Sequence, residues 1–202
     1  MILDSEIWKN DLKKETKKIK KFFAKWDFEE DDSIGKPFIT LQKFSIYTSV
    51  VIRKLIDVRK ISDELLSENF SIENYKKTDS TKVTKWNGYE IEKLYDLELP
   101  LKRNISIKKL TDYLIHSFHF IPKYDWKKFD QELEDEDAEN WYNNGILGIY
   151  FSSDKTKNES LYFIKFNDYL NIIEKVISDH IVQVQYMERE IVKASNKSKA
   201  SS

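Results

Sequence analysis

The feature that most constrains the fold is a run of largely apolar residues at positions 38–58, FITLQKFSIYTSVVIRKLIDV. The run has no glycine or proline and exceeds an ordinary strand in length, so it predicts a helix despite the β-branched residues Val50, Val51 and Ile52. Pro37 fits the first turn, where an N–H group has no partner within the helix. Because apolar side chains occur on several sides of this helix, we expect it to be buried between layers of structure.

Arg53 and Asp57 are charged residues within this run, four positions apart. On a helix this spacing makes the two side chains neighbours, so we expect an ion pair at the helix edge. The alternative is that Arg53 faces a cleft and binds an anion; in a hydrolase or nuclease, Arg53 or Arg103 would hold a phosphate group.

Length and composition indicate a globular protein. The 202 residues suffice for one domain with a sizeable core, and 40% of them are hydrophobic and 14% aromatic. We expect a single α+β domain over 1–193, followed by a disordered polar tail over 194–202. The formal net charge of −1 neither favours nor excludes a nucleic-acid partner.

Several kinds of chemistry are excluded by composition. The chain has no cysteine, which removes disulfides, thiol nucleophiles and cysteine-ligated metal sites. Its four glycines cannot build a phosphate-binding loop or a dinucleotide fingerprint, so the sequence predicts no cofactor. The N-terminus lacks an apolar leader, and no run approaches the ~18 apolar residues of a membrane span. We therefore expect a cytoplasmic protein that does not engage a membrane.

Two segments carry the pattern of a β-hairpin. The first covers 81–97 and has Asn87-Gly88 at its centre, the dipeptide typical of a type I′ turn with positive φ angles. The second joins strands at 146–152 and 161–166 through a polar loop. We expect these hairpins to form one small antiparallel sheet.

Apolar residues at three- and four-residue spacing predict about five helices, at 5–26, 39–58, 62–68, 107–119 and 168–193. Ser62, Ser106 and Asn167 are suited to the N-caps of the last three. The predicted fold is therefore α+β, with the helices packed on a small antiparallel sheet built from two β-hairpins. We expect the long central and C-terminal helices to cover one face of that sheet.

One polar stripe could carry chemistry. On the predicted 107–119 helix, Asp112, His116 and His119 are spaced i, i+4 and i+7, which places all three on one side. A carboxylate and two imidazoles could bind a divalent metal, or act as an acid–base pair in a hydrolase or nuclease. The more common interpretation is an ordinary polar helix face, since no HExxH pattern is present and no further ligand can be named.

The N-terminal helix and a later acidic segment have opposite charges. Lysines, including Lys13, Lys17 and Lys20, cover most of the helix surface opposite its apolar side, whereas 130–139 holds seven acidic residues and no basic one. A charged face of this kind is most often simply solvated. It could also bind nucleic acid or an acidic partner.

Three segments resemble small uncharacterised bacterial proteins found among mobile-element and defence genes. They are IRKLIDVRKISDEL at 52–65, LIHSF at 114–118 and GIYFSSDKTKNESLYFIKFNDYL at 148–170. They cover about a fifth of the chain, and the resemblance implies no particular activity. The helical HEPN ribonuclease toxins require an arginine a few residues before a histidine on one helix, and here Arg103 lies thirteen positions before His116.

The sequence favours a non-catalytic binding or assembly protein that acts through protein–protein contacts, because it lacks recognisable catalytic equipment and carries opposed charge blocks. The predicted 168–193 helix has apolar residues, including Val184 and Met187, in excess of what one small sheet can cover, which suggests a homodimer. One alternative is a hydrolase or nuclease that uses Asp112, His116 and His119. Another is nucleic-acid binding through the lysine face.

Overall fold

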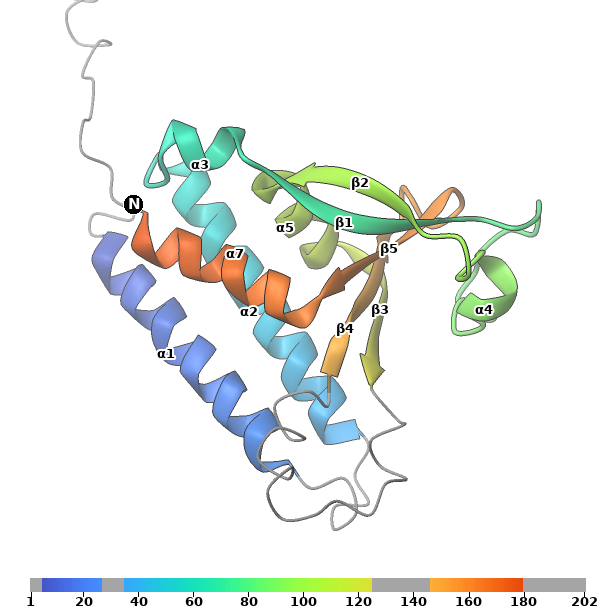
Figure 1. Ribbon diagram of the computed structural model, residues 1–202, viewed down its shortest axis with the longest axis horizontal. Helices are drawn as coiled ribbons and strands as arrows, with labels where there is room; N and C mark the ends of the chain where they lie inside the picture. Colours follow the sequence, from blue (N-terminus) through green and yellow to red (C-terminus); the bar gives the residue numbers. More distant parts are fainter. Residues whose placement is uncertain (1–4, 27–34, 125–145, 180–202) are drawn as a thin grey trace, which may run out of the picture.

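The computed structural model describes residues 5–26, 35–124 and 146–179. Within these ranges, six helices lie against a five-stranded sheet (Figure 1). The elements in chain order are α1 (Ser5–Lys25), α2 (Gly35–Asp57), α3 (Asp63–Ser67), β1 (Asn69–Lys76), α4 (Ile91–Leu94), β2 (Leu101–Ser106), α5 (Ile107–Ile115), β3 (Ser117–Tyr124), β4 (Ile146–Ser153), β5 (Ser160–Lys165) and α7 (Phe166–Ser178). The α+β prediction is confirmed.

All pairings in the sheet are antiparallel, and the strand order is β2-β1-β5-β4-β3. The predicted hairpin of β4 and β5 is confirmed, with Tyr150 opposite Phe163. The sheet is larger than predicted, because β1, β2 and β3 were not expected. It consists of a β1–β2 ribbon and a β3–β4–β5 meander, joined where Glu73 of β1 lies opposite Phe163 of β5.

The predicted hairpin at 81–97 is wrong. The side-chain Oδ1 of Asn87 accepts hydrogen bonds from the backbone N–H (2.7 Å) and the hydroxyl (3.0 Å) of Thr84. The backbone N–H of Gly88 then donates to the carbonyl of Thr84 at 3.0 Å, and Gly88 has no positive φ. These bonds close a compact turn that leads into α4, so the asparagine stabilises a local turn rather than a two-stranded ladder.

The two faces of the sheet are covered differently. Helices α2, α5 and α7 pack on one face, as predicted for the long central and C-terminal helices, and α1 packs against α2 and α7 (Figure 1). The segment 77–97 covers the other face. It forms a second apolar cluster with the sheet, made of Tyr75, Val83, Ile91, Leu94, Tyr95, Tyr150, Leu161 and Phe163.

Helix α5 is shorter than the predicted 107–119 helix. Its N-cap is Ser106, as predicted, and the hydroxyl of Ser106 accepts from the N–H of Lys109 at 3.4 Å. The helix ends at Ile115 and β3 begins at Ser117, with a register shift between Ser117 and His119 that marks a β-bulge. The phenylalanines of this segment are therefore part of a sheet-edge strand instead of a helix.

One of the two remaining N-cap predictions is confirmed and the other is wrong. Ser62 caps α3 as predicted, and its hydroxyl accepts from the N–H of Leu65 at 3.2 Å. Asn167 is not the cap of α7, since that helix begins at Phe166 and its N-cap is Lys165. The predicted continuation of α7 beyond Asp179, the acidic segment 130–139 and the tail 194–202 lie outside the described residues.

Candidate functional site: the groove between α1 and α2

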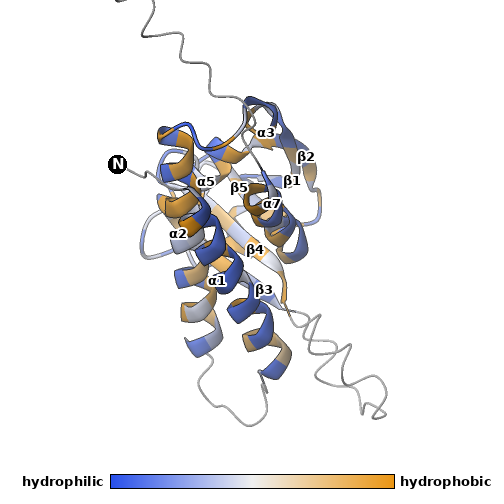
Figure 2. Ribbon diagram, turned by 90° about the vertical axis from the view of Figure 1, so that its left-hand side faces the viewer, coloured by the Kyte–Doolittle hydropathy of each residue, from blue (hydrophilic) through white to orange (hydrophobic). Residues whose placement is uncertain are grey.

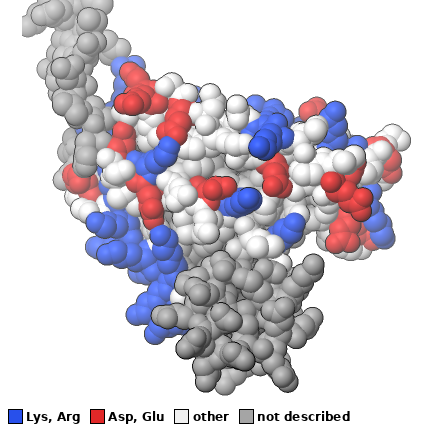
Figure 3. Space-filling model, viewed as in Figure 1, with Lys and Arg blue, Asp and Glu red and all other residues white. Residues whose placement is uncertain are grey.

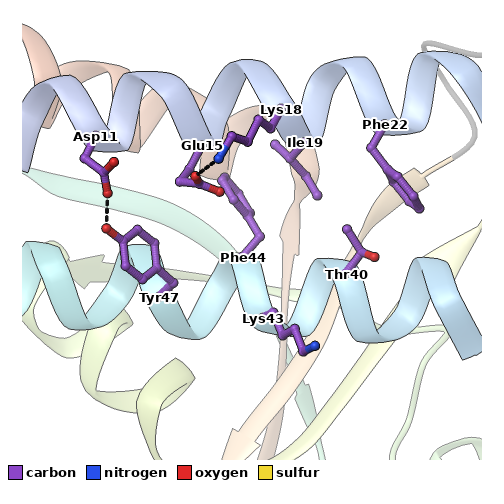
Figure 4. A pocket seen from close by; sticks show the side chains of 9 residues that line it. All are labelled: Asp11, Glu15, Lys18, Ile19, Phe22, Thr40, Lys43, Phe44 and Tyr47. Atoms are coloured by element: carbon purple, nitrogen blue, oxygen red, sulfur yellow. Dashed lines mark hydrogen bonds and ion pairs between the residues drawn. The ribbon is translucent and has the colours of Figure 1, made fainter.

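Helices α1 and α2 lie side by side and form the outermost layer of the molecule (Figure 2). Between them is an open groove with a cavity volume of about 630 Å³. In Figure 4, Asp11 of α1 faces Tyr47 of α2, and Phe22 lies opposite Thr40 further along the groove. The helices therefore run antiparallel. The complete lining is Asp11, Glu15, Lys18, Ile19, Phe22, Thr40, Lys43, Phe44 and Tyr47.

Helix α2 packs between α1 and α5, but its outward side is exposed, so the predicted burial between layers is only partial. Ile39, Ile46 and Val50 are 48%, 37% and 42% exposed, and their spacing places them in one stripe along α2. Six of the eleven exposed large hydrophobic side chains among the described residues belong to α1 or α2, so most of them lie on this layer. We define the α1–α2 face as the groove together with Ile7, Trp8, Ile39, Ile46, Tyr47 and Val50.

The same layer is basic. Helix α1 contains eight lysines and three carboxylates, and α2 contains four basic residues and one carboxylate, so the two helices carry surpluses of five and three positive charges. The lysines gather along α1 in Figure 3. Within the described residues, no acceptor is found for five exposed lysines of α1: Lys13, Lys14, Lys17, Lys21 and Lys25.

Two other lysines of α1 are engaged. Lys20, predicted as a binding residue together with Lys13 and Lys17, forms an ion pair with Glu174 of α7 at 2.7 Å. Lys9, which belongs to the predicted lysine face, is buried, and its ammonium donates to the backbone carbonyl of Asp179 just after α7. Lys9 therefore stabilises the α1–α7 contact and does not belong to the exposed surface.

The carboxylates inside the groove are already paired. Asp11 accepts a hydrogen bond from the hydroxyl of Tyr47, and Glu15 forms an ion pair with Lys18 at 2.5 Å (Figure 4). Burial and the hydrogen bond to Asp11 raise the pKa of Tyr47 to about 12, so its hydroxyl stays protonated. In contrast, Lys43 at the edge of the groove has no acceptor within the described ranges. Within the groove, Lys18 and Lys43 balance the charges of Asp11 and Glu15, so the surplus of positive charge lies on the exposed lysines of α1 outside the groove lining.

The predicted Asp112, His116 and His119 stripe does not form. Asp112 lies on α5 and pairs with Arg53 of α2. His116 is the exposed C-cap of α5, and His119 lies on β3. The prediction failed because the helix ends at Ile115, so Asp112 and His119 are no longer two turns apart on one helix.

His119 is buried on the side of the sheet opposite α5. Its Nδ1 is 2.6 Å from the hydroxyl of Ser152 on β4, and the rings of Tyr95 and Phe118 contact the imidazole edge-on. Burial lowers the pKa of His119 to about 4, which keeps the ring neutral. Its side chain is 3% exposed and Ser152 is fully buried, and His119 lies at the base of an open pocket of about 540 Å³ that Gly88 and Phe118 also line. The contacts indicate a structural histidine.

Nε2 of His119 faces Gly88 in the segment that covers this side of the sheet. A Cβ atom at position 88 would lie 3.2 Å from Nε2 and 3.0 Å from the ring of Phe118. Glycine is needed here because the backbone approaches the histidine closely, and not because of a positive φ. The predicted hairpin glycine therefore has a packing role.

Both arginines predicted to hold a phosphate are occupied. Arg53 pairs with Asp112 and, through its Nε at 3.2 Å, with Asp57, so the predicted i, i+4 pair is present. Arg103 donates to the hydroxyl of Tyr162 at 2.9 Å and lies over the ring of the same tyrosine. The guanidinium of Arg53 is therefore paired with two carboxylates, whereas the partners of Arg103 are a hydroxyl and an aromatic ring.

Two other kinds of site are absent from the described residues, a metal centre and a membrane-spanning helix. No group of three or more histidine, aspartate or glutamate side chains there is arranged to hold a metal ion. No helix in the same part of the chain has the length and apolar character to cross a membrane. Comparisons with known protein families, curated proteins and solved structures found no match.

The sequence predicts that the central helix is buried between layers because apolar residues, among them Ile46 and Val50, lie on several of its sides. The same pattern could have identified the exposed residues of α2. When apolar residues occur on several sides of a helix and the domain is too small to cover every side, one apolar side stays exposed.

Proposed function

We propose that this chain is a non-catalytic protein-binding module and that its α1–α2 face docks a partner protein. The observation that carries the proposal is the concentration of exposed apolar side chains on α1 and α2, next to an open groove of about 630 Å³. Contiguous apolar surface of this kind, bordered by polar residues, is typical of interaction sites. The resemblance to mobile-element and defence proteins stays a prediction.

A hydrolase or nuclease has less support. His119 lies on β3, apart from Asp112 and His116 at the end of α5, and Asp112 is held by Arg53. Nucleic-acid binding has one favourable observation, the unpaired lysines of α1, among them Lys13 and Lys17. Phosphates bound by these lysines would, however, leave the exposed apolar side chains of Ile39, Ile46 and Val50 on α2 uncovered.

A homodimer through this face is disfavoured by charge. Two copies brought together across a two-fold axis would face each other with the same surplus of positive charge on α1 and α2. The homodimer predicted through Val184 and Met187 concerns residues outside the described ranges and stays a prediction.

Photo-crosslinking tests the proposal. A photoreactive phenylalanine analogue at Val50 should form discrete adducts with a protein partner when the chain is expressed in its own host. The same analogue at Leu99, which is 68% exposed and lies between α4 and β2, is the matched control. Absence of adducts at Val50, or the same adducts from both positions, would contradict the proposal.

A further inference from the structure

We propose that the partner segment bound by the α1–α2 face is an acidic amphipathic α-helix. This inference rests on the proposed function and specifies the chemistry of the partner. The helix would lie along the groove, with its apolar side on Ile46 and Val50 and an apolar anchor in the cavity between Phe22 and Phe44. Its carboxylates would meet the lysines at the edges of the groove.

The backbone of the groove walls favours a helix over an extended peptide. Both walls are α-helices, whose backbone N–H and C=O groups are bonded within each helix. An extended segment binds through main-chain hydrogen bonds to an open strand edge, and the groove provides no such edge. A helical partner satisfies its own backbone and needs only side-chain contacts.

The shape and spacing of the face also match a helix. Ile39, Ile46 and Val50 form a stripe with the i, i+7, i+11 spacing of one helical side, and helices pack by placing such ridges into the grooves of their neighbours. The cavity between α1 and α2 is concave and wide enough for large apolar side chains. A flat membrane surface would leave this hollow unfilled.

The charge pattern of the two helices favours an acidic partner. Lys14 lies one turn before Lys18, and Lys43 lines the wall formed by α2, with no acceptor for Lys14 or Lys43 among the described residues. Within the groove, Glu15 is paired with Lys18, whereas Asp11 keeps its negative charge because its partner is the neutral hydroxyl of Tyr47. The surplus of five positive charges on α1 and three on α2 nevertheless favours an acidic helix, whose carboxylates can pair with these ammonium groups, over a basic one.

The test uses the full chain and two synthetic probe helices of about 20 residues. Both carry leucines at helical spacing on one side, and the remaining positions are mainly glutamate in one probe and lysine in the other. Fluorescence anisotropy should show binding of the glutamate probe at least about tenfold tighter than binding of the lysine probe, with the difference reduced at high salt. Equal affinity for both probes would overturn the inference.

Variants identify where the probe binds. Val50→Glu should weaken binding of the glutamate probe, and the double variant Lys14→Glu, Lys43→Glu should shift the preference toward the lysine probe. Leu99→Glu is the matched control and should leave both affinities unchanged, and circular dichroism should show that each variant is folded. If Val50→Glu and Leu99→Glu behave alike, the probe is not bound at this face and the inference is wrong.

Two further arms separate this inference from other ligands and from the proposed function itself. Short duplex DNA and vesicles rich in anionic lipid should bind more weakly than the glutamate probe, and tighter binding of either would overturn the acidic-helix proposal. If Val50 crosslinks to a protein partner but the glutamate probe does not bind, the proposed function stands and the partner class is wrong. If both experiments fail, both proposals fall.

Discussion

Protonation of His119 should couple the stability of the fold to pH. The imidazole is buried against Ser152, Tyr95 and Phe118, and its pKa is lowered from 6.5 to about 4. The unfolded chain therefore binds a proton near pH 6.5, whereas the folded chain binds one only near pH 4. Because the unfolded state takes up the proton first, stability is full above about pH 6.5 and is lost as the pH falls.

The size of this effect follows from the pKa difference. Each unit of pKa difference corresponds to about 1.4 kcal/mol, so His119 alone should lower the free energy of unfolding by about 2 kcal/mol between pH 7 and pH 5. The loss should reach about 3 kcal/mol at pH 4. This is a large part of the stability of an ordinary domain, which lies between about 5 and 15 kcal/mol.

Urea unfolding at several pH values between 7 and 4 measures the effect. His119→Asn removes the titrating group while leaving a polar atom near Ser152, and it should flatten the pH dependence even though it is less stable at pH 7. Other acid-sensitive groups are common to both proteins, so the difference between wild type and variant isolates His119. His116→Asn, at an exposed position, is the control. Equal pH slopes for wild type and His119→Asn would refute the reasoning.

Two further predictions concern packing. Gly148→Ala should lower the free energy of unfolding, measured in urea, by about 1–3 kcal/mol. A Cβ atom there would lie 2.3 Å from the carbonyl oxygen of Ile164. Gly35→Ala, with no atom within 4 Å of the new Cβ, is the matched control and should leave stability equal or higher. Tyr169→Phe should cost about 1–2 kcal/mol in the same assay, since the buried hydroxyl lies 2.6 Å from that of Thr48. An unchanged midpoint would show that this hydroxyl is not important for stability.

Helix caps and one β-hairpin could be predicted from the sequence because they depend on residues that are close together in the chain. The N-caps Ser62 and Ser106 and the β4–β5 hairpin were all predicted, since each rests on residues close together in the chain. The helix prediction beyond Ile115 failed because Leu114 and Phe118 continue a helical period, whereas the pairing of β3 with the distant β4 overrides that period. A single sequence carries little signal for such long-range pairing.

The candidate site was only partly predictable for a related reason. The lysines of α1 and the apolar character of α2 were evident from the sequence, but which side of α2 remains uncovered depends on where α5 and β3 pack. Asp112, His116 and His119 looked adjacent only on an unbroken helix. For the α1–α2 face and for the predicted polar stripe, the sequence shows the residue types but not which side chains lie beside them in the fold.

The order of strands in the sheet has a consequence for how the protein is made. During synthesis, β1 and β2 can pair early, but β1 acquires its second neighbour only when β5 has emerged, since Glu73 lies opposite Phe163. Such distant pairing is slow, because a long loop must close first. Helix α7 follows β5 directly and holds α1 beside α2. We therefore expect the α1–α2 face to appear only in chains whose synthesis has passed α7, so that incomplete chains do not compete for the partner.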